Sequence, residues 1–156
     1  MDGTPGSKTA KRTLFDAIAT RRVIAAVIGA CCLALLLLAA SLKPDPSGTG
    51  THTQLGLPTC GWVLSMDLPC PTCGYTTAFT ATVHGRFLEG FLAQPVGAIL
   101  ALATAVFFLG SMLIVLTGAP LENILGRFWT PRVTWTLLAV IILAWVYKML
   151  RFRGIF

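Results

Sequence analysis

Residues 23–42 read VIAAVIGACCLALLLLAASL, a run of 20 residues without a charged side chain. A helix needs roughly 20 apolar residues to cross the ~30 Å hydrocarbon core of a bilayer. Two more apolar stretches follow, at residues 95–118 and 133–147. The third is short, but Lys148 can extend its ammonium group to the membrane interface and so lengthen the span. The sequence therefore predicts three transmembrane helices.

The residues at the ends of these stretches agree with that prediction. Pro95 suits the first turn of the second helix, where its missing N–H group is not needed. Aromatic side chains gather near the ends of the third span, as in an interfacial belt. They are Trp129, Trp135, Trp145 and Tyr147.

The composition excludes a water-soluble protein. Of the 156 residues, 55% are hydrophobic and 12% are charged, whereas a soluble domain carries roughly 25% charged residues. So few charges cannot cover a water-facing surface, and the lipid bilayer must be the solvent for much of the chain. We expect an all-α integral membrane protein with one helical domain at residues 23–150. A basic arm at residues 1–22, partly disordered, precedes it, and a basic tail at residues 151–156 follows it. A cysteine loop occupies residues 43–74, and its residues 43–53 are also expected to lack regular structure.

The first span has some features of a cleavable signal peptide. A basic segment precedes it, and it ends in the small residues Ala39, Ala40 and Ser41. However, its apolar run exceeds the ~7–15 residues of a typical signal core, which favours an uncleaved anchor. Cys31 and Cys32 then lie in mid-membrane, where we expect them to pack as small apolar side chains.

The charges predict the orientation. Residues 1–22 hold five basic and two acidic side chains, whereas residues 43–69 hold one basic and two acidic side chains. Because an excess of Lys and Arg stays on the cytoplasmic side, we expect a cytoplasmic N-terminus and an extracytoplasmic cysteine loop in a bacterial inner membrane. The basic tail, with Lys148, Arg151 and Arg153, would face outside after three crossings and inside after four. The region after the cysteine motif is only weakly apolar, so a short interfacial or re-entrant helix and a fourth crossing both stay open.

The basic character does not indicate nucleic-acid binding. No binding motif or interleaved aromatic residues accompany the basic arm, and attraction to anionic lipid explains it better. The chain also has no Ser–His–Asp triad, phosphate loop or HExxH helix, and only six acidic residues. The lipid bilayer is therefore the partner that the sequence indicates, and no protein partner is specified.

The chemistry of the chain centres on Cys70-Pro71-Thr72-Cys73-Gly74. If Pro71 is the first helical residue, Cys70 is an N-cap whose thiolate is favoured by the helix dipole, and Cys73 lies one turn along. Thr77, Thr80 and His84 continue the face of Cys73 as a polar stripe. Such a pair can exchange disulfides, bind a metal or hold the loop as a structural disulfide. The sequence leaves these three interpretations open.

A metal site would draw on more of the loop. Cys60, Cys70 and Cys73 with His52 make a Cys₃His set that suits zinc. His84 cannot join Cys73 in one unbroken helix, because eleven residues separate them by roughly 16 Å. We expect His84, which precedes a glycine, to cap the end of the helix.

One stretch of the chain resembles a known protein family. Residues 68–85, LPCPTCGYTTAFTATVHG, and the Gln94-Pro95 step after them resemble a family of bacterial membrane proteins, domain of unknown function 2752. Its hallmark is a Cys-Pro-x-Cys-Gly-x-Thr segment followed by a turn ending in Gly and an Asn-Pro or Gln-Pro step. The resemblance covers residues 57–116, with Thr77 where Arg is common. It implies a small helical membrane protein and a candidate cysteine site, and it brings no established activity.

Two function classes follow from the sequence. The first is a membrane binding or accessory protein whose outward-facing cysteine motif holds a metal or a disulfide. The alternative is a membrane thiol–disulfide oxidoreductase with Cys70 as the attacking thiol, Cys73 as its partner and Cys60 as a relay. That class, linked to quinone, normally uses a second cysteine pair, and this loop offers only Cys60. The binding role is therefore favoured over the enzyme.

Overall fold

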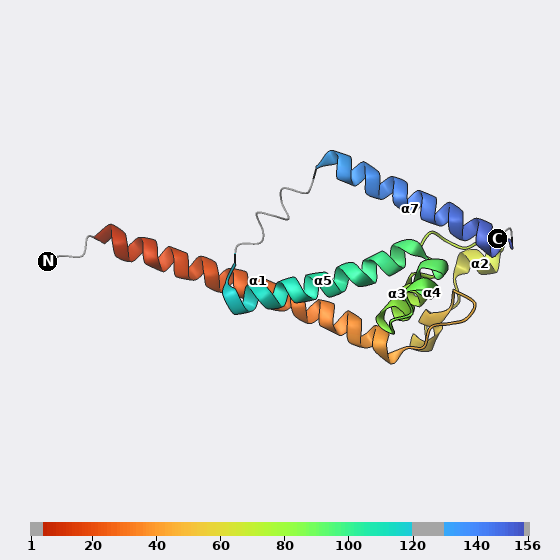
Figure 1. Cartoon of the computed structure of the whole chain (residues 1–156), viewed down its shortest axis with the longest axis horizontal. Coiled ribbons are helices and arrows are strands. Elements are labelled where there is room, and N and C mark those ends of the chain that lie inside the picture. The colour runs from red at the N-terminus through yellow and green to blue at the C-terminus, as the bar shows by residue number, and fades with distance from the viewer. Residues whose placement is uncertain (1–4, 120–129, 155–156) are drawn as a thin grey trace.

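The computed structural model describes residues 5–119 and 130–154. Every regular element in these two segments is a helix. In chain order they are α1 (Pro5–Ser41), the 3₁₀ helix η1 (Thr51–Leu55), α2 (Gly61–Met66), α3 (Tyr75–Val83), α4 (Phe87–Ala93), α5 (Pro95–Thr117) and α7 (Pro131–Phe152), shown in Figure 1. The all-α prediction is confirmed.

Three of these helices are long and apolar enough to cross a membrane. They are the segments Asp16–Ser41, Pro95–Thr117 and Pro131–Phe152. The predicted spans at residues 23–42, 95–118 and 133–147 coincide with them. Their large apolar side chains are mostly exposed, which is expected where lipid is the solvent. The prediction of three candidate spans is confirmed.

Small residues bring α1 and α5 together side by side (Figure 1). A Cβ atom added at Gly29 of α1 would lie 3.2 Å from the Cβ atom of Ser111 of α5, so the two backbones approach closely at this point. Ala25 and Ala39 of α1 and Ala101 of α5 are also buried. Close backbone approach at small residues is the usual way in which membrane helices associate, because lipid tails compete equally well for large apolar side chains.

The short helix α3 lies at the centre of one end of the molecule, in contact with α1, α4, α5 and η1. Thr77, Ala78 and Thr80 are almost completely buried, so the two threonines of the predicted polar stripe face the protein interior, whereas His84 at its end is exposed. The Thr77 and Thr51 hydroxyl oxygens lie 2.9 Å apart in a buried hydrogen bond. With nine residues, α3 is only ~14 Å long, too short to cross a bilayer. The described residues therefore hold no helix for a fourth crossing at this position.

The next helix, α4, is short and has an exposed apolar face. Its Gly90 and Ala93 are buried, whereas Phe87 and Leu88 are 52% and 73% exposed. A Cβ atom at Gly90 would lie 2.9 Å from the carbonyl oxygen of Ala78, so α4 packs tightly on α3. An exposed apolar face on a short helix beside three spans fits the expected interfacial element.

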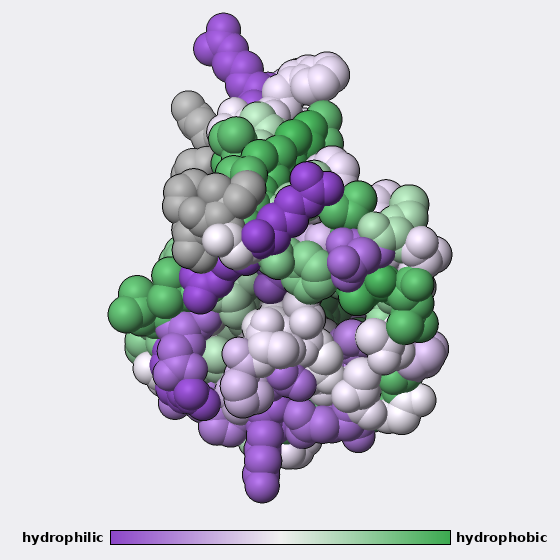
Figure 2. All heavy atoms as spheres, turned by 90° about the vertical axis from the view of Figure 1, so that its right-hand side faces the viewer, coloured by the Kyte–Doolittle hydropathy of each residue, from purple (hydrophilic) through white to green (hydrophobic). Residues whose placement is uncertain are grey.

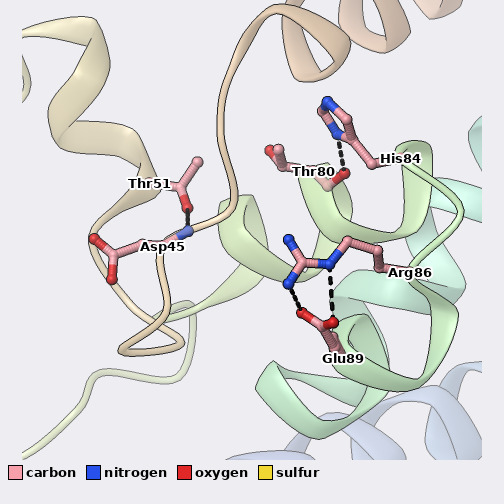
Figure 3. Close-up of polar contacts among 6 residues, drawn as sticks. All are labelled: Asp45, Thr51, Thr80, His84, Arg86 and Glu89. Atoms are coloured by element: carbon pink, nitrogen blue, oxygen red, sulfur yellow. Dashed lines mark hydrogen bonds and ion pairs between the residues drawn. The ribbon is translucent and has the colours of Figure 1, made fainter.

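The loop between α1 and η1 is more ordered than we expected from its Pro- and Gly-rich sequence. The Gly48 N–H donates to the Asp45 carbonyl at 3.0 Å, and the Asp45 N–H donates to the Thr51 hydroxyl at 2.9 Å (Figure 3). Residues 1–4 of the N-terminal arm lie outside the described part of the chain. The α1 helix begins at Pro5, within the segment that we expected to be partly disordered.

The last helix, α7, joins the others only near its C-terminal end. Residues 130–143 are exposed, and Ala144 and Lys148 are its buried residues. The end of α1, the start of α5 and the end of α7 all lie at the end of the molecule that holds α2, α3 and α4 (Figure 1). Figure 2 looks onto this end, where hydrophilic residues gather with hydrophobic ones at the margins. The cysteine motif belongs to this polar end.

Candidate metal centre

Three of the five cysteines come together at the polar end. The Sγ atoms of Cys60, Cys70 and Cys73 all lie within 4.8 Å of one another. Cys70 Sγ and Cys73 Sγ lie 3.2 Å apart, and all three thiols are free. Cys73 is buried, and the other two are half-buried. Three of the four predicted metal ligands therefore form one cluster.

The local geometry of the motif differs from the sequence prediction. Residues 71–74 form a turn, with the Cys73 N–H donating to the Cys70 carbonyl at 3.0 Å. The helix α3 begins only at Tyr75, and its N-cap is Gly74, with a φ of 89°. The prediction that Cys70 is the N-cap was wrong, because Gly74 adopts the left-handed conformation that reverses the chain between the thiols and the helix. Cys70 consequently lies four residues before the N-cap of α3.

Cys60 is the cysteine that occupies an N-cap position, at the start of α2. Burial acts to raise the pKa of its thiol. The backbone N–H of Val63 and the thiols of Cys73 and Cys70 outweigh this effect and lower the pKa to about 7. A thiolate at this position is therefore accessible near neutral pH.

Cys73 shows the opposite behaviour. Burial, together with hydrogen bonds to the thiols of Cys70 and Cys60, raises the pKa of Cys73 to about 12. In the metal-free cluster, the buried thiol keeps its proton while the thiol at the start of α2 loses its proton first. A divalent cation would override this difference, because metal binding deprotonates every coordinating thiol.

The two histidines lie outside the sulfur cluster. His52 is in η1, where its Nε2 lies 3.2 Å from the Pro58 carbonyl oxygen, and the structure does not bring it to the three Sγ atoms. His84 is the C-cap of α3, and its Nδ1 lies 2.9 Å from the Thr80 carbonyl oxygen (Figure 3). The capping role expected for His84 agrees with this geometry, whereas His52 is not a neighbour of the cysteines.

The remaining cysteines are separate from the cluster. Cys31 is exposed and Cys32 is half-buried, both in the middle of α1. The packing that we expected for both is therefore not seen for Cys31, whereas Cys32 is partly packed.

Side chains from other elements hold the cysteine turn from outside. Trp145 Nε1 of α7 donates to the Pro69 carbonyl at 3.1 Å, and Gln94 Nε2 approaches the Pro71 carbonyl at 3.5 Å. Lys148 Nζ of α7 donates to the Gly48 carbonyl at 2.9 Å and to the Ala93 carbonyl at 3.0 Å. These contacts connect the turn to the second and third candidate spans.

Sequence reasoning missed the role of α7. It assigned Trp145 and Lys148 to the membrane interface, but Lys148 is only 4% exposed and does not extend outward. Trp129, also assigned to the interface, lies outside the described residues. The sequence signal for this role was the spacing of Trp145 and Lys148, since two hydrogen-bond donors three residues apart share one helix face. Their acceptors are backbone carbonyls, which no sequence pattern marks.

The donor set fits a soft metal ion. A tetrahedral zinc ion with Zn–S bonds of ~2.3 Å places its sulfur atoms ~3.8 Å apart, so the three thiols need to shift by only about 1 Å to bind it. No fourth His, Cys, Asp or Glu atom of the described residues belongs to the cluster. A fourth ligand would come from water or from another molecule, as in zinc sites with three protein ligands.

The three cysteines lie in a segment that matches a known protein family. Residues 60–108 match the family described as Protein of unknown function (DUF2752). The matched segment begins at Cys60 and continues into α5, so it contains the whole sulfur cluster and covers about a third of the chain. The resemblance noted from the sequence is thereby confirmed for this segment. No curated protein and no solved structure matches the chain.

Proposed function

We propose that this chain is a multi-pass protein of a bacterial plasma membrane that binds one zinc ion through Cys60, Cys70 and Cys73. It would act as a binding or accessory protein. The observation that carries the proposal is the convergence of three thiols within 4.8 Å of one another. A disulfide would join two of them and leave the third unpaired, whereas a metal ion uses all three. The free fourth position would let water or a partner's side chain complete the site.

The charges support an extracytoplasmic position for this site. The arm at residues 1–22 has five basic side chains against two acidic ones, and the loop between α1 and α2 has no such excess. The three candidate spans bring the basic tail to the same side as the cysteines. This arrangement opposes the charge rule less than the sequence suggested, because Lys148 is buried in the protein and only Arg151 and Arg153 of the basic tail are exposed.

Metal analysis of the purified full chain tests the zinc site. We expect about one zinc ion per chain in the unsubstituted protein and none after Cys73→Ser. The double substitution of Cys31→Ser and Cys32→Ser is the matched control, since these two cysteines lie outside the cluster, and it should retain the metal. A folded chain that contains no zinc and binds none when zinc is added would contradict the proposal.

Thiol labelling of intact cells tests the side of the membrane. After treatment with a chelator and a reductant, a membrane-impermeant maleimide applied outside should label Cys60. Omission of the chelator should protect the cluster if a metal occupies it. Labelling of Cys60 only from the cytoplasmic side would overturn the proposed orientation.

The same labelling experiment distinguishes the zinc-binding role from the oxidoreductase alternative. Oxidation of Cys70 and Cys73 to a disulfide releases two electrons and two protons, which a quinone in the membrane would have to accept. That model predicts that labelling of Cys70 requires the reductant and not the chelator, whereas Cys60 is labelled without either. If Cys70→Ser leaves quinone-linked thiol oxidation unchanged, the enzyme model fails.

A further inference from the structure

Lys148 is a buried cation without an anionic partner. It lies near the end of an apolar helix and is 4% exposed. Its Nζ donates to the carbonyl oxygens of Gly48 and Ala93 at 2.9 and 3.0 Å, which uses two of its three N–H groups. In the described segments no carboxylate forms an ion pair with it. Buried lysine side chains are almost always paired with an opposite charge, because an uncompensated buried charge is strongly unfavourable.

The nearby carboxylates have other partners. Lys148 lines a polar hollow of about 610 Å³ together with Asp45, Glu89, Arg86 and Arg151. Glu89 accepts a hydrogen bond from Arg86 Nε at 2.9 Å and forms an ion pair with it (Figure 3). The Asp45 carboxylate accepts the Ser47 N–H at 2.8 Å. Neither carboxylate neutralises the lysine.

The cysteine cluster is the other possible source of negative charge. A Cβ atom added at Gly74 would lie only 2.9 Å from Lys148 Nζ, and Gly74 directly follows Cys73 in the motif. The ammonium group therefore lies beside the cysteine motif, at the residue that follows the buried Cys73.

We infer that Lys148 neutralises the charge of the metal–thiolate centre and thereby couples the attachment of α7 to metal binding. This inference rests on the proposed zinc site. When a divalent ion binds, the three thiols release three protons, and three thiolates with one M²⁺ ion carry a net charge of −1. One lysine ammonium of charge +1 makes the buried assembly neutral.

In this arrangement, metal binding and the attachment of α7 favour each other. A metal-loaded centre attracts Lys148 and holds the C-terminal end of α7, and a docked α7 raises the affinity of the centre for metal. Metal should therefore stabilise the folded chain more strongly when Lys148 is present than when a neutral side chain replaces it.

Three variants of the full chain in detergent micelles separate charge from structure. Lys148→Gln removes the charge but keeps N–H donors for the carbonyls, whereas Lys148→Met removes both. Arg151→Gln is the matched control, because Arg151 lies one turn further along α7, is exposed and belongs to the same hollow. Affinity for Zn²⁺ would be measured by competition with a chromophoric chelator. Co²⁺ would report the centre through its sulfur-to-cobalt absorption bands.

We expect both Lys148 variants to bind Zn²⁺ and Co²⁺ about 10- to 100-fold more weakly, the usual loss when an outer partner of a metal ligand is removed. Their sulfur-to-cobalt bands should move to longer wavelength, because a thiolate without a positive neighbour gives up an electron more easily. Arg151→Gln should leave both readouts unchanged. The rise in melting temperature on adding Zn²⁺ should be smaller in Lys148→Gln than in the unsubstituted chain.

Two results would overturn the inference, and they differ from each other. If Lys148→Gln lowers the metal-free melting temperature but leaves the Co²⁺ affinity and bands unchanged, Lys148 has only a structural role. If the unsubstituted chain binds neither metal, the proposed zinc site fails, and the inference fails with it.

Discussion

The first and second candidate spans are held together differently from the third. Between α1 and α5, small residues such as Gly29 and Ser111 allow two backbones to approach closely along the helices. The third span, α7, is exposed over residues 130–143 and is joined at one end by side-chain donors that reach backbone carbonyls. Trp145 donates to Pro69 and Lys148 donates to Gly48 and Ala93, and Tyr147 donates to Leu92 at 3.3 Å.

This difference has a physical cause and a consequence. In lipid, large apolar side chains gain little by leaving the bilayer, so a helix needs either small residues for close packing or polar contacts for attachment. The α1–α5 pair uses the first solution. The α7 helix uses the second, and its carbonyl acceptors belong to Pro69 beside the cysteine turn, to the loop after α1 and to the end of α4. The position of α7 therefore depends on the conformation of the cysteine end.

The largest expected effect comes from Gly74→Ala, at the junction of the two regions. Gly74 has a φ of 89°, and an added Cβ would lie 2.7 Å from the Gly48 carbonyl oxygen and 2.9 Å from Lys148 Nζ. The left-handed backbone and the contacts together should lower the free energy of unfolding by about 3 kcal/mol. Zinc affinity should fall with it, measured on the purified chain.

Gly85→Ala is the matched control for this change. Gly85 also has a positive φ, 77°, but nothing lies within 4 Å of its added Cβ. Only the backbone term remains, about 1 kcal/mol, and zinc affinity should stay unchanged. Equal losses in the two variants would show that the close approach of Lys148 to the motif is unimportant.

A smaller effect is expected within the tightly packed bundle, from Gly97→Ala. An added Cβ at this buried position of α5 would lie 2.9 Å from the Ala78 Cβ and 3.1 Å from backbone atoms of Tyr75. Separation of α3 from α5 should destabilise the chain by about 2 kcal/mol, measured by denaturant titration in mixed micelles.

Gly110→Ala on the same helix provides the comparison, because its added Cβ meets nothing within 4 Å. Its stability should be unchanged or slightly higher, since alanine favours the helix. If both substitutions are tolerated equally, small-residue packing does not hold this bundle together.

The smallest effect should come from Trp145→Phe. This change removes the Nε1–H donor to the Pro69 carbonyl, a single hydrogen bond worth about 1 kcal/mol, and keeps most of the apolar surface. Faster alkylation of Cys70 in the metal-free chain would report the loosened turn. Trp135→Phe, at a position that is 71% exposed, should leave the rate unchanged, and a similar acceleration in both variants would argue against attachment through Trp145.

The sequence predicted the candidate site in part. Cys60, Cys70 and Cys73 form the cluster as expected, but His52 does not approach it. The spacing of Cys70 and Cys73 restricts them to neighbouring positions in any turn or helix, so this pair was predictable from local geometry. His52 was included for its donor chemistry alone, and its ring instead lies beside the Pro58 carbonyl.

By itself, the sequence determined the candidate spans and the paired thiols. The length of an apolar run decides whether a helix can cross a bilayer, and two cysteines three residues apart are always close. Only the tertiary structure decided that Gly74, rather than Cys70, caps α3 and that α7 reaches the cysteine turn. The bonds from Trp145 to Pro69 and from Lys148 to Gly48 join residues 76 and 100 positions apart. Their acceptors are backbone carbonyls, which every residue carries, so only the folded chain selects which of them receive a bond.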